Sequence, residues 1–136
     1  MSQLTISQVA QRAGLKPSAI RYYEQIGILP LPSRMGGKRR YDLTVMYRLA
    51  IVQRARQMGF TLDEIRQLFF GFRPVTRASE RWIRLSHRKM AELDALVHEI
   101  RDMQQLLRKM MRRCRCETLD QCGKGIFTTN CRDSGV

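Results

Sequence analysis

Four cysteines near one end of the chain are its most reactive residues. All follow residue 113 of 136, and three have the close spacing Cys114-x-Cys116-x5-Cys122. Thiolates are strong ligands for soft metal ions, and a Cys-x-Cys pair can direct both sulfurs into one site from a loop. Clustered cysteines in a reducing compartment more often bind metal or respond to redox state than form structural disulfides. The spacing predicts a thiolate site made by Cys114, Cys116 and Cys122, with Cys131 as a candidate additional ligand.

A long helix precedes these cysteines. Residues 79–113 contain neither Gly nor Pro, and apolar residues recur at intervals of three and four. This is the a/d pattern of a coiled coil, and a small protein cannot cover such a long stripe by itself. We therefore predict a dimerisation helix in a homodimer, with Ser79 as its N-cap. The residues with this spacing are Leu93, Leu96, Ile100, Met103, Leu107 and Met110.

The first quarter of the chain has the pattern of two short helices joined by a tight turn. Gly14 ends the first, Pro17 suits the first turn of the second, and Gly27 ends the second. This is the helix-turn-helix pattern, in which the start of the second helix usually contacts base edges in DNA. The candidate DNA-contacting residues of this helix are Lys16, Ser18, Arg21 and Tyr22.

A basic hairpin follows. Gly36-Gly37 suits a two-residue turn, and the next residues are three cations and an aromatic side chain. Cations beside an aromatic ring predict contacts to phosphate and sugar, so Arg39, Arg40 and Tyr41 are further candidate DNA-binding residues. Two more helices complete this part, one capped by Asp42 and one opened by the Thr61-x-x-Glu64 capping box.

The charge distribution indicates a polyanionic partner. The net charge is +13, with 12 Lys and Arg against 4 Asp and Glu over residues 1–75, and a neutral balance after residue 113. Double-stranded DNA is the partner that such a folded basic half predicts. No apolar run approaches the roughly 18 residues of a membrane span, and no secretory signal is evident. We expect a soluble cytoplasmic protein with no membrane partner.

Together these features predict a mainly α fold in three parts. Residues 1–75 form a winged helix-turn-helix DNA-binding domain, and residues 76–113 form the dimerisation helix. Residues 114–136 form a cysteine-rich effector-binding tail, expected as a short loop. We do not expect an enzyme, because no CxxC and no paired His/Asp arrangement accompanies the thiols.

Several ordered motifs resemble the MerR family of bacterial transcriptional regulators, from about residue 4 to residue 122. The resemblance implies a winged helix-turn-helix, a long antiparallel coiled-coil helix and a C-terminal effector loop. It also implies that dimers distort promoter DNA so that RNA polymerase can engage it. The motifs are Thr5-Ile6-Ser7-Gln8-Val9-Ala10, Ala19-Ile20-Arg21-Tyr22-Tyr23-Glu24, Gly27-Ile28-Leu29, Arg39-Arg40-Tyr41 and Met58-Gly59-Phe60-Thr61-Leu62-Asp63-Glu64-Ile65.

Two branches of that family suggest different effectors. The seven residues between Cys114 and Cys122 are similar to the loop of the copper(I)-sensing branch, which also has a serine where Ser79 stands. In an antiparallel dimer, Ser79 of the second subunit would complete the site. The three-cysteine spacing is also similar to the iron–sulfur SoxR branch, although Met111 replaces its first cysteine. A [2Fe-2S] cluster usually needs four ligands, so Cys131 would have to supply one.

Other occupants fit the cysteines by ligand count. Mercury(II) would use three thiolates, and zinc would use four. The function predicted is a dimeric DNA-binding transcriptional regulator that responds to a thiolate-bound metal and distorts its promoter. The alternatives are a redox-responsive regulator with a [2Fe-2S] cluster and a constitutive DNA-binding protein with a structural zinc.

Overall fold

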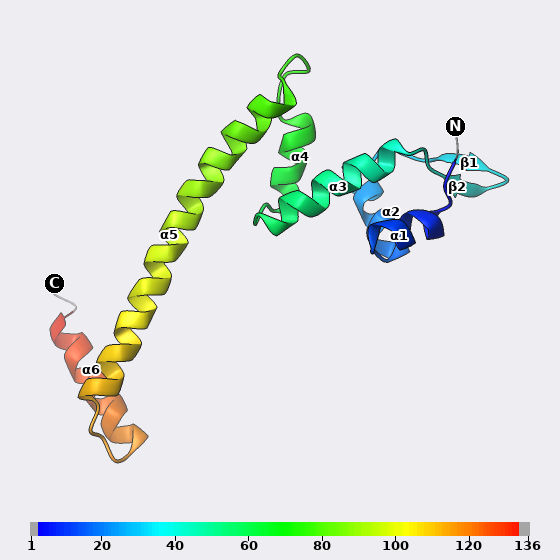
Figure 1. Cartoon of the computed structure of the whole chain (residues 1–136). Coiled ribbons are helices and arrows are strands. Elements are labelled where there is room, and N and C mark those ends of the chain that lie inside the picture. Colours follow the sequence, from blue (N-terminus) through cyan, green and yellow to red (C-terminus); the bar gives the residue numbers. More distant parts are fainter. Residues whose placement is uncertain (1–2, 134–136) are drawn as a thin grey trace. The chain divides into compact units, whose positions relative to one another are not determined.

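The computed structural model describes residues 3–133, with side chains as far as residue 129, and it is mainly helical (Figure 1). The chain divides after Met90 into two compact units, and helix α5 contributes to both. The predicted fold class is confirmed. The elements are α1 (Ile6–Ala13), α2 (Pro17–Gln25), β1 (Ser33–Met35), β2 (Lys38–Arg40), α3 (Thr44–Gln57), α4 (Leu62–Phe70), α5 (Ala78–Arg113) and α6 (Leu119–Asp133).

Local signals determine the helix-turn-helix. The Thr5 hydroxyl accepts a hydrogen bond from the Gln8 backbone N–H at 3.2 Å, and the Gln8 side chain accepts one from the Thr5 N–H at 2.9 Å. This capping box starts α1, and Gly14 ends it in the left-handed conformation, at φ 68°. Pro17 is the first residue of α2, where its missing N–H removes no helical hydrogen bond.

The two strands form the predicted basic hairpin, which we call the wing. They are antiparallel, and Met35 pairs with Lys38 across the turn. Gly36 and Gly37 both have positive φ, 59° and 79°, as a type I′ turn requires. Backbone hydrogen bonds of 2.7 and 2.8 Å in both directions between Leu4 and Tyr41 join the end of the wing to the start of the chain.

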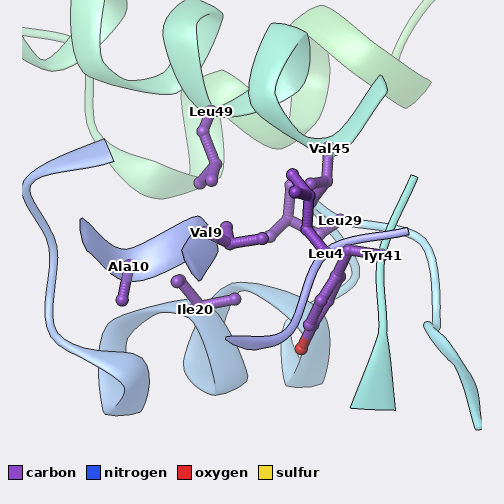
Figure 2. Packing of buried hydrophobic residues seen from close by; sticks show 8 residues of the cluster. All are labelled: Leu4, Val9, Ala10, Ile20, Leu29, Tyr41, Val45 and Leu49. Atoms are coloured by element: carbon purple, nitrogen blue, oxygen red, sulfur yellow. The ribbon is translucent and has the colours of Figure 1, made fainter. Parts of the chain in front are cut away.

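The N-terminal unit contains two clusters of buried apolar side chains. The first joins α1, α2 and α3 to the segments that flank the wing (Figure 2). The second lies among α3, α4 and the start of α5. The first contains Leu4, Val9, Ala10, Ile20, Leu29, Tyr41, Val45 and Leu49, and the second contains Ile28, Val52, Ala55, Phe60, Ile65, Leu68 and Leu85.

Two cationic side chains on the first turns of α5 bind to groups of α4. The Lys89 ammonium lies 2.9 Å from the Glu64 carboxylate and 5.4 Å from the centre of the Phe60 ring. The Arg81 guanidinium donates hydrogen bonds of 3.1 and 3.0 Å to the carbonyls of Leu68 and Phe69. These carbonyls belong to the last turn of α4, which lacks helical donors for them. The first three turns of α5 therefore belong to the N-terminal unit.

Three local expectations are wrong. Ser79 does not cap α5, because the helix begins at Ala78 and the Arg77 carbonyl accepts the Arg81 N–H at 3.1 Å. Asp42 is not the N-cap residue of α3, which is Leu43, although its carboxylate accepts the Thr44 N–H at 2.8 Å. The tail is not a loop throughout, since only five residues separate α5 from helix α6.

A capping motif explains α6. The Thr118 hydroxyl accepts the Gln121 N–H at 3.2 Å, and the Gln121 side chain accepts the Glu117 N–H at 3.1 Å. These bonds satisfy donors that a helix N-terminus leaves unpaired. They start the helix although Gly123 and Gly125 lie inside it.

The apolar stripe of helix α5 is exposed to solvent in the single chain. The six residues at heptad spacing are 37–63% exposed within this chain. In the part of the chain that the structure describes, no helix has the length and apolarity to cross a membrane.

Candidate functional site

The structure brings three of the predicted ligands together. Cys114 follows the last residue of α5, Cys116 lies in the connection, and Cys122 is in the first turn of α6. Their sulfur atoms all lie within 4.8 Å of one another. Three sulfurs at about 2.3 Å from one metal would be roughly 4 Å apart, so this spacing fits a shared ion. The side chain of Cys131, the candidate fourth ligand, lies outside the described residues.

Hydrogen bonds among the thiols distinguish Cys114 from Cys116. The backbone N–H and the thiol of Cys116, and the thiol of Cys122, donate to the Cys114 sulfur and lower the pKa of Cys114. The positive charge of Arg115 acts in the same direction. Donation to Cys114 raises the pKa of Cys116. Cys114 is therefore more readily available than Cys116 as a thiolate, the form that binds metal.

A groove of about 360 Å³ borders the three cysteines. Its apolar wall comes from Leu106, Met110 and Ile126, and Lys109 and Arg113 add positive charge. Cations at the C-terminal end of a helix interact favourably with the helix dipole, and they also stabilise nearby thiolates. The Lys109 and Arg113 side chains therefore stabilise a site that becomes negatively charged when its thiols lose their protons.

The predicted DNA-binding residues belong to the N-terminal unit. Lys16, Ser18, Arg21 and Tyr22 are exposed at or after the start of α2. Arg39 and Arg40 are half-buried on β2. Arg21 and Arg39 line one hollow together with Ser18 and Tyr22, so α2 and the wing contribute to the same surface. Ser79, the residue predicted from the second subunit, is exposed near the start of α5.

Tyr41 is not on this surface. Its side chain is 3% exposed and packs in the first apolar cluster, with its hydroxyl at the edge of that cluster (Figure 2). The hydroxyl donates a hydrogen bond to the Glu24 carboxylate. Burial, and then this bond, raise the pKa of Tyr41 well above its usual value, so the donor keeps its proton. We therefore withdraw Tyr41 as a DNA-contacting residue, because its ring is enclosed by protein.

Sequence reasoning missed Glu24. This α2 residue is 7% exposed, and its carboxylate lies 3.2 Å from the Nε of Arg39. Its position beside Tyr23 in an otherwise basic stretch is visible in the sequence, but the sequence does not indicate its burial. It joins α2 to the wing.

Comparisons with known proteins agree with these features. The family described as MerR HTH family regulatory protein matches residues 4–70, and the one described as MerR, DNA binding matches residues 46–110. The HTH-type transcriptional regulator HmrR of Rhizobium leguminosarum bv. viciae is 32% identical over 120 residues, which cover 88% of this chain and 92% of that protein. CueR of Yersinia pestis, also named as an HTH-type transcriptional regulator, is 33% identical over 112 residues, covering 82% of this chain and 81% of that protein.

A solved structure supports the same assignment. The transcription regulator PbrR691 from Ralstonia metallidurans CH34, crystallised in complex with lead(II), is 32% identical and superposes with a TM-score of 0.72. The match covers 85% of this chain and 91% of that one. With a helix-turn-helix, a basic wing and a long exposed helix before the cysteines, this chain belongs to the MerR family of DNA-binding transcriptional regulators.

Proposed function

We propose that this protein is a homodimeric regulator whose response is triggered by a soft metal ion bound to Cys114, Cys116 and Cys122. The observation that carries the proposal is the approach of these three sulfur atoms to within 4.8 Å of one another. Their thiolates would hold the ion, and the metal–sulfur bonds would link the start of α6 to the end of α5. Its named relatives are transcriptional regulators, which supports a regulatory rather than an enzymatic role for this protein.

The third sulfur favours a three-thiolate site over a two-thiolate one. A linear site on Cys114 and Cys122 alone would leave Cys116 unused, yet its sulfur lies with the other two. The relative PbrR691, 32% identical, was solved with lead(II), an ion that is soft and divalent. Three thiolates around a divalent ion leave one net negative charge, which Lys109 and Arg113 in the adjoining groove would stabilise.

The apolar stripe of α5 supports the dimer. Side chains from Leu93 to Met110 form a coiled-coil seam that is exposed in the single chain. Exposed apolar stripes of this length are usually covered by a partner helix. In an antiparallel pair, Ser79 of the second subunit would lie beside the cysteines, so each metal site would use both chains. Because the seam would hold the two chains together and each site would use both of them, metal binding would depend on the geometry of the dimer.

We further propose that metal binding changes the path of promoter DNA. A dimer places two copies of α2 and of the wing on one duplex, and a change in the angle between them would bend or untwist it. Deforming a site of this size costs on the order of 1–6 kcal/mol, which differential metal affinity can supply. RNA polymerase would then engage the distorted promoter.

The test is metal uptake by the purified full chain. Protein prepared without oxygen is analysed for bound metal and sulfide, and its absorption spectrum is recorded. It is then titrated with mercury(II), lead(II), copper(I) and zinc, and sulfur ligands are counted by X-ray absorption spectroscopy. We expect a protein without sulfide that binds one ion per site through three sulfurs. An iron–sulfur spectrum with stoichiometric sulfide would instead establish the redox-responsive alternative.

Cys116→Ser separates the two coordination modes. A three-thiolate site should lose more than about 100-fold in affinity, since even an outer-shell partner contributes roughly 10- to 100-fold. A two-thiolate site would keep most of its affinity. The control is Thr129→Ala, which alters a groove-lining residue without removing a thiol. Equal affinities of wild type and Cys116→Ser would contradict the three-thiolate proposal.

A further inference from the structure

Glu24 is an acidic side chain in a place where acids are unfavourable. It lies on α2, where Arg21 is exposed, and the exposed Lys16 directly precedes this helix. Of the side chains that the structure describes, Glu24 is the sole buried acidic one, at 7% exposed. A buried carboxylate is tolerated when charge and hydrogen bonds compensate for the lost water. A buried negative charge this close to a basic surface needs a structural or functional explanation.

Both partners of this carboxylate come from the wing and the residue that follows it. Oε2 of Glu24 lies 3.2 Å from Nε of Arg39, and Oε1 accepts the hydroxyl hydrogen bond of Tyr41. Arg39 is on β2, and Tyr41 directly follows that strand. The three side chains therefore join two elements that are 15 to 17 residues apart in the sequence.

The arrangement leaves the outer edge of the Arg39 guanidinium available. An arginine side chain has five N–H donors in a fixed plane, and Glu24 occupies only the one on Nε. Neither terminal amino group donates to a described residue. Arg39 borders the hollow that also contains Ser18, Arg21 and Tyr22, which offer further donors.

We propose that Glu24 is a positioning residue for DNA, because it holds the Arg39 guanidinium so that its free edge faces one backbone phosphate between α2 and the wing. The proposal rests on the DNA-binding function of the family. A planar guanidinium held at one edge loses little freedom when its other edge binds phosphate, and pre-ordered donors of this kind increase affinity. Glu24 itself would not touch DNA.

For the variant Glu24→Gln, the proposal predicts a change in DNA affinity opposite in sign to the change expected from net charge alone. Glu24→Gln removes a negative charge beside a polyanion, so long-range electrostatics alone would tighten binding. If Glu24 positions Arg39, the same substitution weakens binding, because a neutral amide holds the guanidinium less firmly. The matched control is Asp63→Asn, which makes the same charge change at an exposed side chain on α4. It should leave the affinity unchanged or slightly higher.

Binding is measured with a 30-base-pair duplex selected by the wild-type protein from a randomised pool. At 150 mM salt we expect Glu24→Gln to weaken binding by on the order of 10-fold. The slope of log affinity against log salt should become shallower by up to about 0.9 per protomer, since one phosphate contact is lost. In an Arg39→Ala background, Glu24→Gln should cause no further loss.

Three results would overturn the proposal. The first is equal or tighter binding by Glu24→Gln, and the second is the same loss with and without Arg39. The third is failure of the wild type to select any duplex, which would also refute the DNA-binding function, whereas the first two leave that function intact. If Glu24→Gln unfolds below the assay temperature, Arg39→Lys replaces it. That variant keeps the charge without the planar edge, and wild-type affinity and salt slope in it would equally overturn the proposal.

Discussion

The ion pair between Lys89 on α5 and Glu64 on α4 permits a quantitative prediction for Lys89→Met. The two side chains are 9% and 16% exposed, and the charged atoms are 2.9 Å apart. Removing one partner of a fully buried pair costs about 3–5 kcal/mol. The cost here should be smaller, because Glu64 retains its hydrogen bond from the Thr61 N–H and methionine preserves the apolar stem. We expect a loss of about 2 kcal/mol in the free energy of unfolding, a roughly 30-fold change in the equilibrium constant.

Urea unfolding at fixed protein concentration measures this loss, because the stability of the proposed dimer would depend on concentration. With a slope of about 2 kcal/mol per molar, the midpoint should fall by roughly 1 M. Arg84→Met is the matched control, since it breaks the exposed Glu80–Arg84 pair. Exposed pairs contribute less than about 1 kcal/mol. Equal midpoint shifts for the two variants would refute the argument that burial makes the Lys89 pair strong.

The same pair predicts a pH dependence. Partial burial raises the pKa of Glu64, but hydrogen bonds from Thr61 and Lys89 outweigh it, so the net pKa lies below the usual 4.5. A carboxyl with a lowered folded-state pKa stabilises the fold above its unfolded pKa, and the contribution is lost as pH falls through the folded value. The difference between wild type and Lys89→Met should therefore be full at pH 7 and shrink below pH 4.5. A difference that is constant down to pH 3 would contradict this reasoning.

Three other substitutions test the wing, the phosphate contact of Arg40 and the seam of α5. Gly37→Ala should destabilise the wing by about 1 kcal/mol, measured by urea unfolding, because φ is 79° and the cost is backbone strain rather than a clash. Arg40→Ala should weaken binding to all duplexes and flatten the salt dependence, as loss of a phosphate contact does; an unchanged salt slope would exclude that contact. Ile100→Glu should convert the proposed dimer to monomer in analytical ultracentrifugation, whereas Glu99→Gln, beside it, should not; a dimeric Ile100→Glu protein would contradict the proposed seam.

The parts of the fold that depend on neighbouring residues were predictable from the sequence. Thr61 and Glu64 form their capping box, and Gly36-Gly37 forms its turn, because three or four adjacent residues contain the whole interaction. The clustering of the three cysteine sulfurs was predictable for the same reason, since only nine residues span them.

Features that depend on distant packing were not predictable in this way. Tyr41 was expected at the surface because cations precede it, but the core formed by α1, α2 and α3 encloses its ring. The Glu24 carboxylate is buried and paired with Arg39 because the wing packs against α2, and the sequence alone does not reveal that packing. Helix α6 was missed although Thr118-x-x-Gln121 resembles the motif that starts α4. Gly123 and Gly125, which follow this motif, are both unfavourable inside a helix, so the local signal in the sequence is weak.

Transcription from a promoter that contains the selected duplex tests whether the three cysteines are the metal sensor of this regulator. Purified RNA polymerase, the protein and the metal identified by uptake are combined, and transcript is measured with and without metal. We predict that metal changes the output of the wild type, while Cys114→Ser and Cys122→Ser bind the same duplex with wild-type affinity and do not respond. A normal metal response by both variants would show that these cysteines are not the sensor.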